Sequence, residues 1–107
     1  MAKPKFTLVA KPTFTAKVAI PIPGQAAEMV EFTFKGRTRD QFAEFIESIK
    51  DGEVKDVEVI MDIASGWELE DAFDAKNIEV LTQNYLGAAR AIIDKYLAEL
   101  TTARLGN

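Results

Sequence analysis

The chain has 107 residues, 48% of them hydrophobic, and a formal net charge of −4. This length and composition fit one domain, which we expect to span residues 1–107. Because cysteine and histidine are both absent, the sequence excludes disulfide bonds, thiolate chemistry and the commonest general base and metal ligand.

The charges are divided unevenly along the chain. Residues 1–37 carry six basic and two acidic side chains, a net +4, whereas residues 38–107 carry seven basic and fifteen acidic ones, a net −8. The acidic second part argues against nucleic-acid binding there, since phosphate contacts need clustered Lys and Arg. No apolar run reaches the roughly 18–20 residues that cross a bilayer, and no signal-peptide core follows the first residues. We therefore expect a cytoplasmic protein that binds neither membrane nor nucleic acid.

Residues 1–37 contain three strand-like runs, at 5–9, 13–20 and 28–35. The apolar residues that alternate with polar ones in the last two runs are Phe14, Ala16, Val18, Ile20, Val30, Phe32 and Phe34. This period of two is typical of strands with one buried face. The prolines and glycine of residues 21–24 predict a loop between these two runs. We predict a small antiparallel β-meander of about three strands, which helices must cover.

A first helix is predicted from Thr38, because Thr38 and Gln41 form a capping box. The residues of its apolar stripe are Phe42, Phe45, Ile46 and Ile49. We expect this stripe to lie in the core and to cover the sheet. Residues 50–52, with a lysine and a glycine, predict the end of the helix.

Residues 53–64 fit both a helix and a strand, and we favour a helix. Their apolar residues exceed one helix face: Val54, Val57, Val59, Ile60, Met61 and Ile63. We expect this surface either to be enclosed by the last two helices or to contact a partner or a second copy of the chain, so self-association is a further expectation.

Gly66 and Trp67 mark the boundary between this segment and the rest of the chain. A glycine adopts positive φ at little cost, so Gly66 is predicted as the C′ residue of a helix that ends near Ala64 or Ser65. Trp67, the only tryptophan, either anchors the turn against the core or binds a partner. The acidic turn that follows, residues 68–73, places further charges beside it.

The last part of the chain is predicted to contain two helices. Asp74 is a suitable N-cap for the first, which carries Ile78, Leu81 and Tyr85, and Asn84 to Gly87 interrupt it. The second runs over about 88–103, with the apolar face Ala89, Ile92, Ile93, Tyr96, Leu97 and Leu100. Arg104 and Gly106 predict its end. The expected fold is α+β, with the β-meander in residues 1–37 packed against about four helices in residues 38–107.

The sequence predicts no catalytic, cofactor-binding or metal-binding residues. Carboxylates are frequent between residues 56 and 74, but no pair has the spacing of a calcium loop or lies beside a recognisable catalytic group. No phosphate-binding glycine loop and no nucleophile elbow is present. We therefore do not expect an enzyme.

Several short segments, in a fixed order, resemble the tail assembly chaperones of long-tailed bacteriophages and prophages. They are the run from Phe32 to Phe45, the sequence Ser65-Gly66-Trp67 with its acidic turn, the run from Asn77 to Ala88, and the ending from Tyr96 to Asn107. The resemblance covers roughly residues 28–107.

This resemblance implies a non-enzymatic protein that binds the tape-measure protein and helps to recruit tail-tube subunits around it. Such proteins act in the cytoplasm of the bacterial host and are typically absent from the finished virion. A structural tail component and an unrelated acidic protein-binding module are the alternatives. The acidic and aromatic residues that we expect to bind the partner are Trp67, Glu68, Glu70, Asp71 and Phe73.

Overall fold

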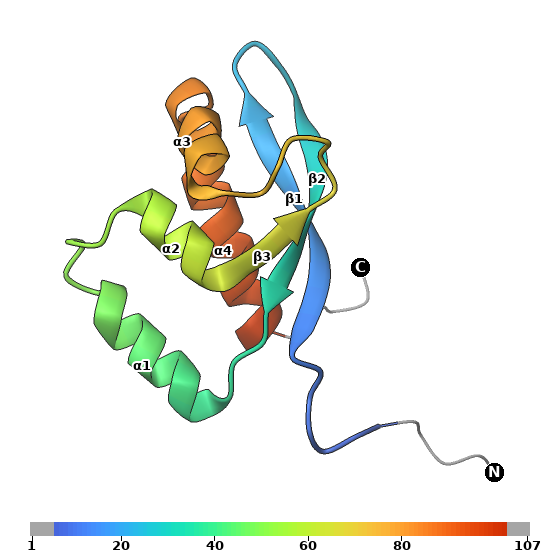
Figure 1. Ribbon diagram of the computed structural model, residues 1–107, viewed down its shortest axis with the longest axis vertical. Coiled ribbons are helices and arrows are strands. Elements are labelled where there is room, and N and C mark those ends of the chain that lie inside the picture. Colours follow the sequence, from blue (N-terminus) through green and yellow to red (C-terminus); the bar gives the residue numbers. More distant parts are fainter. Residues whose placement is uncertain (1–5, 103–107) are drawn as a thin grey trace.

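A computed structural model describes residues 6–102 and shows a three-stranded antiparallel sheet with helices on one side (Figure 1). In chain order the elements are β1 (Thr13–Ile22), β2 (Gln25–Lys35), α1 (Arg39–Ile49), α2 (Asp56–Ile63), β3 (Ala64–Trp67), α3 (Ala75–Asn84) and α4 (Ala88–Thr101). This arrangement confirms the predicted α+β class with three strands and four helices. The predicted helix end at Arg104 and Gly106 lies outside the described residues.

Strands β1 and β2 form a long hairpin whose alternation was predicted. Ala16 lies opposite Phe32, and Val18 opposite Val30, so the apolar residues of both strands share one face. The predicted loop over residues 21–24 is wrong in part, because β1 continues to Ile22 and only Pro23 and Gly24 form the turn. Since β1 is an edge strand, a proline near its end removes no hydrogen bond that the sheet requires.

The third strand is not the predicted one. Residues 6–9 form no strand, whereas Ala64–Trp67 pairs with β2 as β3, with Phe32 opposite Trp67. The predicted helix C′ role of Gly66 is therefore wrong: within residues 6–102 only Gly24 and Gly52 have positive φ. The backbone turns extended at Ala64, where it meets the open edge of β2, so a long-range pairing decides the conformation.

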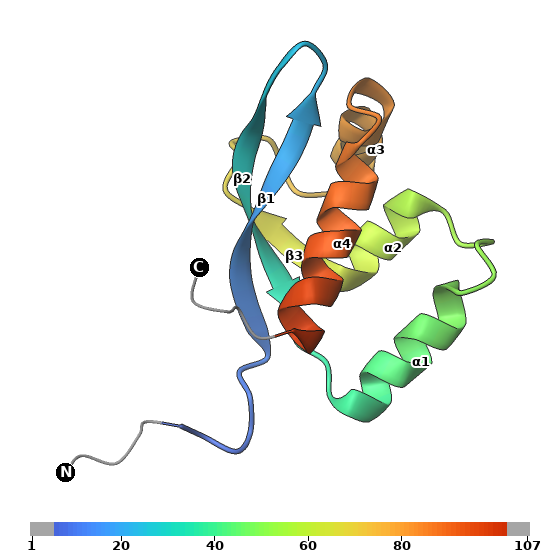
Figure 2. The ribbon, with the colours of Figure 1, turned by 180° about the vertical axis from the view of Figure 1, so that it is seen from behind.

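Helices α2 and α4 cover the apolar face of the sheet, and α3 packs against both (Figures 1 and 2). The largest fully buried side chains are Tyr96, Phe32, Phe34, Ile60, Ile63, Ile78, Ile92 and Val18. The core also encloses Val59, Ile60 and Ile63 of α2. This is the first of the two outcomes expected for the segment, enclosure within the fold. Val54, Val57 and Met61 pack at the margin of the core.

Helix α1 does not cover the sheet, contrary to the prediction. It lies beside the other helices and has little backbone contact with them (Figure 2). Its capping box at Thr38 is as predicted, but Phe45 alone of its apolar stripe is buried, while Phe42, Ile46 and Ile49 stay partly exposed. The reason is that α4 already covers the sheet, with Ala88, Ala89, Ile92 and Tyr96 buried, so α1 is left at its margin.

Candidate functional site

Trp67 lies at the end of β3, on the side of the sheet that carries the helices. Its indole packs edge-on against Phe32, with ring centroids 5.8 Å apart, and against Phe73 at 5.3 Å. The indole Nε1–H donates a hydrogen bond of 2.7 Å to the backbone carbonyl of Asp71. Trp67 therefore closes the acidic turn as a structural anchor, yet it remains partly exposed.

The acidic turn is tied to the sheet through Glu68. The backbone N–H of Glu68 donates to the carbonyl of Glu31 at 3.0 Å, and the Glu31 N–H donates to the Glu68 carboxylate at 2.8 Å. Glu70 is exposed, and its side chain makes no hydrogen bond or ion pair with another residue in 6–102. The structure thus uses Glu68 to position the turn and leaves Glu70 open to solvent.

A groove opens between this turn and α3, with a volume of about 400 Å³. We call it the Trp67 groove; its lining residues are Trp67, Leu69, Asp71, Asn77, Val80, Leu81, Asn84 and Tyr85. Val80 and Leu69 are 52% and 39% exposed, so the groove offers apolar surface to solvent. Concave apolar surface with a few polar groups is typical of binding sites.

The predicted site residues are brought only partly together. Trp67 and Asp71 line the Trp67 groove, Phe73 supports the indole from behind, and Glu68 and Glu70 lie on the adjoining turn. The wall supplied by α3 was missed. Val80 carried the available signal, because this apolar residue lies off the predicted face of Ile78, Leu81 and Tyr85.

The amides of α3 fix the far wall of the groove. Asp74 caps the helix as predicted, with its side chain accepting from the Asn77 N–H at 2.8 Å. The Asn77 side chain donates to the Ala72 carbonyl at 2.7 Å, which ties the turn to the helix. Asn84 donates to the Val80 carbonyl. The groove is therefore held on both sides by hydrogen bonds.

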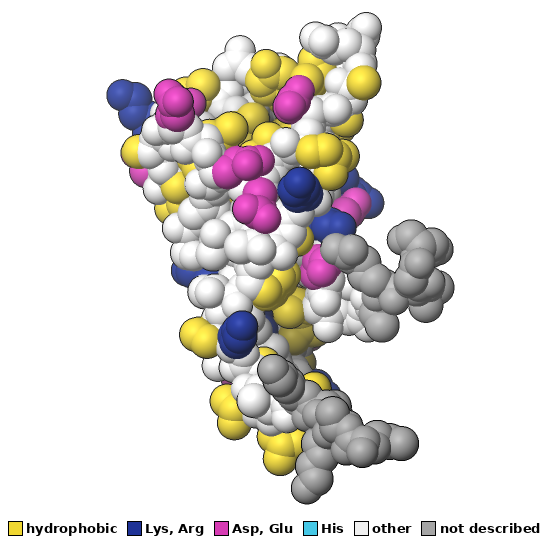
Figure 3. Space-filling view, turned by 90° about the vertical axis from the view of Figure 1, so that its right-hand side faces the viewer, with side chains coloured by type: hydrophobic (Ala, Val, Ile, Leu, Met, Phe, Trp, Pro, Cys, Tyr) yellow, Lys and Arg dark blue, Asp and Glu magenta, His cyan; other side chains and the backbone are white. Residues whose placement is uncertain are grey.

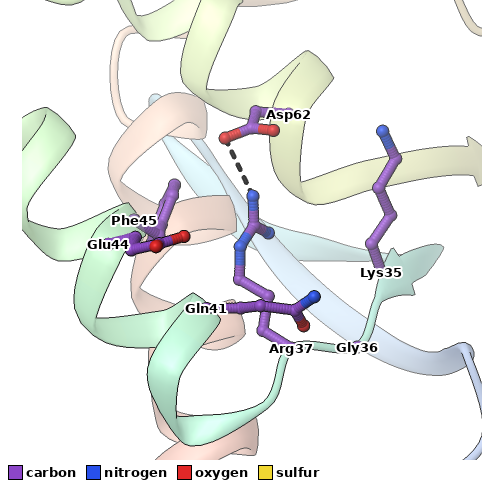
Figure 4. A pocket seen from close by; sticks show the side chains of 7 residues that line it. All are labelled: Lys35, Gly36, Arg37, Gln41, Glu44, Phe45 and Asp62. Atoms are coloured by element: carbon purple, nitrogen blue, oxygen red, sulfur yellow. Dashed lines mark ion pairs between the residues drawn. The ribbon is translucent and has the colours of Figure 1, made fainter.

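A second hollow lies between α1 and α2, around Arg37 (Figure 4). The Arg37 guanidinium forms a 2.9 Å ion pair with Asp62, donates to the Tyr96 hydroxyl at 2.8 Å, and lies 4.5 Å from the ring centre of Phe45. The Tyr96 hydroxyl donates to the Lys35 carbonyl at 2.8 Å. These contacts of Arg37 hold α1 in place through Phe45. Because the guanidinium is already engaged by them, the hollow does not form a free anion site.

Burial raises the pKa of the Tyr96 hydroxyl above its ordinary value, although the hydrogen bond from Arg37 acts in the opposite direction. Tyr96 stays neutral at physiological pH, as the hydrogen bond that its hydroxyl donates to the Lys35 carbonyl requires.

Within residues 6–102 no three acidic side chains lie close enough to hold a metal ion. Nor does that part of the chain contain a helix long and apolar enough to cross a membrane.

No individual curated protein and no solved structure matches this sequence. A family model described as phage tail assembly chaperone matches residues 1–107, the entire length. This protein therefore belongs to the phage tail assembly chaperone family.

Proposed function

We propose that the protein binds the tape-measure protein through the Trp67 groove and helps to recruit tail-tube subunits during tail assembly. Family membership supports the assembly role. The observation that carries the choice of site is the exposed apolar surface of Val80 and Leu69 beside an acidic turn.

The chemistry of the groove defines the kind of segment that it accepts. Its lining has five large apolar side chains, one carboxylate and no cation. A helix of the client with an apolar stripe and flanking Lys or Arg fits this surface, in the manner of other helix-in-groove contacts. The apolar stripe supplies affinity, while the carboxylates of Glu70 and Asp71 attract the cations and fix the orientation.

The activity requires no catalytic step, and we infer that the protein is not an enzyme. It acts in the cytoplasm of the bacterial host and leaves before the virion is complete. Mass spectrometry of purified tails tests this last point. Its detection there in stoichiometric amounts would identify a structural tail component instead.

Binding is tested with Glu70→Gln combined with Asp71→Asn, measured in a titration against the tape-measure protein. We expect the dissociation constant to rise about tenfold, an effect of roughly 1.4 kcal/mol, and added salt to weaken the wild-type complex. Glu53→Gln with Asp51→Asn is the matched control, because it removes the same charges from the exposed loop between α1 and α2. Equal affinity of all three proteins would refute the role of the acidic turn.

The apolar part is tested separately with Val80→Asp. This exposed position tolerates the change in the fold, but a carboxylate in the groove opposes an apolar helix. Unchanged melting temperature with lost binding is the expected result; retained binding would place the client elsewhere on the molecule.

A further inference from the structure

The segment before β1, residues 6–11, contains three of the four most exposed large hydrophobic side chains of residues 6–102. We call it the arm. Phe6, Leu8 and Val9 are 78%, 95% and 84% exposed, and the arm pairs with no strand in the described part of the chain. Adjacent exposed apolar side chains of this size are uncommon on a monomer and mark contact surfaces.

The arm leaves the body of the molecule in a fixed direction. The Gly36 N–H donates to the Pro12 carbonyl at 2.8 Å, which holds the root of the arm against the end of β2. The approach is close: a Cβ on Gly36 would lie 3.1 Å from the Lys11 carbonyl oxygen. From this root the arm runs away from α3 and the turn after β3, which occupy the other half of the molecule (Figures 1 and 2).

The arm and the Trp67 groove are chemically complementary. Residues 1–11 contain Lys3, Lys5 and Lys11 and no acidic residue, with apolar side chains between the lysines. The groove has an apolar lining without a cation, and the turn beside it carries Glu68, Glu70 and Asp71. Figure 3 views the molecule from the right-hand side of Figure 1. On this face most of the visible acidic side chains lie in the upper half, and hydrophobic side chains are exposed at the lower end.

We propose that the arm of one copy of this chain docks in the Trp67 groove of a second copy. Because the two surfaces differ and lie in opposite halves of the molecule, the contact is head to tail and leaves one arm and one groove free at the ends. Further copies can therefore add in the same way.

The arm and the client then compete for one groove. This regulation rests on the proposed function, whereas the contact between arm and groove does not. The client must displace the arm, so self-association declines as the client binds.

Two full-length variants test the contact. Phe6→Ser with Leu8→Ser disables the arm, and Glu70→Lys with Val80→Asp disables the groove. Multi-angle light scattering over a concentration series should show a wild-type mass that rises with concentration and each variant as a monomer. An equal mixture of the two should give a dimer and nothing larger, because one intact arm and one intact groove remain. A wild type that stays monomeric, or a mixture that does, overturns the proposal.

The single tryptophan gives an independent readout at the site itself. A synthetic peptide of residues 1–12 contains no tryptophan, so any change in emission reports Trp67. Added to the full-length arm variant, it should change Trp67 emission saturably, with at least about tenfold weaker binding when the peptide carries serine at positions 6 and 8. An unchanged emission overturns the contact. If the arm variant, like the groove variant, fails to bind the client while the peptide still binds to the arm variant, only the proposed function is refuted.

Discussion

Phe45 is the one buried side chain of α1, which makes Phe45→Ala the sharpest test of how this helix is attached. Phe45 is 3% exposed, and its ring packs edge-on against Tyr96 at 5.9 Å and beneath the Arg37 guanidinium at 4.5 Å. Truncation of a buried phenylalanine costs about 3–5 kcal/mol, and the aromatic and cation contacts are part of that loss. The free energy of unfolding of a typical domain is only about 5–15 kcal/mol in all. We therefore expect the free energy of unfolding to fall by about 3–5 kcal/mol.

The assay is urea denaturation followed by two signals, far-UV circular dichroism and Trp67 fluorescence. Phe42→Ala is the matched control, since Phe42 lies on the same helix but is partly exposed and outside the core cluster. It should cost less than about 1 kcal/mol. Similar losses for the two variants, or a loss below about 1 kcal/mol for Phe45→Ala, would refute the inferred anchoring of α1.

Four further substitutions check particular backbone and hydrogen-bond assignments. Tyr96→Phe removes two hydrogen bonds and should cost about 1–3 kcal/mol in urea denaturation. Burial raises the pKa of Tyr96, so the neutral hydroxyl stabilises the fold fully below the unfolded pKa of about 10, and this stabilisation is lost as pH rises through the folded pKa. The melting temperature of the wild type should therefore fall more steeply above about pH 10 than that of Tyr96→Phe. Gly66→Ala should change the free energy of unfolding by less than about 0.5 kcal/mol, since the new Cβ meets nothing closer than 3.9 Å. Gly52→Ala, at φ +73°, should cost about 1 kcal/mol. Melting curves that reverse this order would mean that Gly66, not Gly52, needs a positive φ, as a helix C′ residue does. Thr38→Ala should cost about 1 kcal/mol through the lost cap, and a neutral result by the same measurement would mean that α1 begins elsewhere.

Local signals in the sequence predicted local structure correctly. The capping box at Thr38, the N-cap at Asp74 and the alternation in β1 and β2 all depend on residues a few positions apart. The same signals misplaced the third strand. Residues 5–9 have strand-like sequence, but residues 6–9 pair with no strand of the sheet. Ala64–Trp67 is extended because β2 is there to pair with it.

Only one side of the candidate site, the turn that follows β3, could be predicted from such local signals. Trp67 and Asp71 belong to one turn, so their proximity follows from sequence distance. Val80 and Tyr85 reach the groove only through the packing of α3 against α2 and α4, which no short spacing encodes. The misplacement of α1 has a similar origin, since its stripe fits a sheet that α4 already covers.

The late position of β3 and α4 in the chain has a consequence during synthesis. The β1–β2 hairpin is complete once Lys35 has been made, but a two-stranded hairpin is only marginally stable alone. From Lys35 to Thr101 the ribosome must add 66 residues, which at about 5–20 residues per second takes roughly 3–13 s. Until α4 has been made, the sheet lacks one of the two helices that cover it, and Phe34 lacks the Tyr96 ring that packs on it at 5.4 Å. The hairpin is therefore the part of the nascent chain that the host's own folding machinery would be expected to bind.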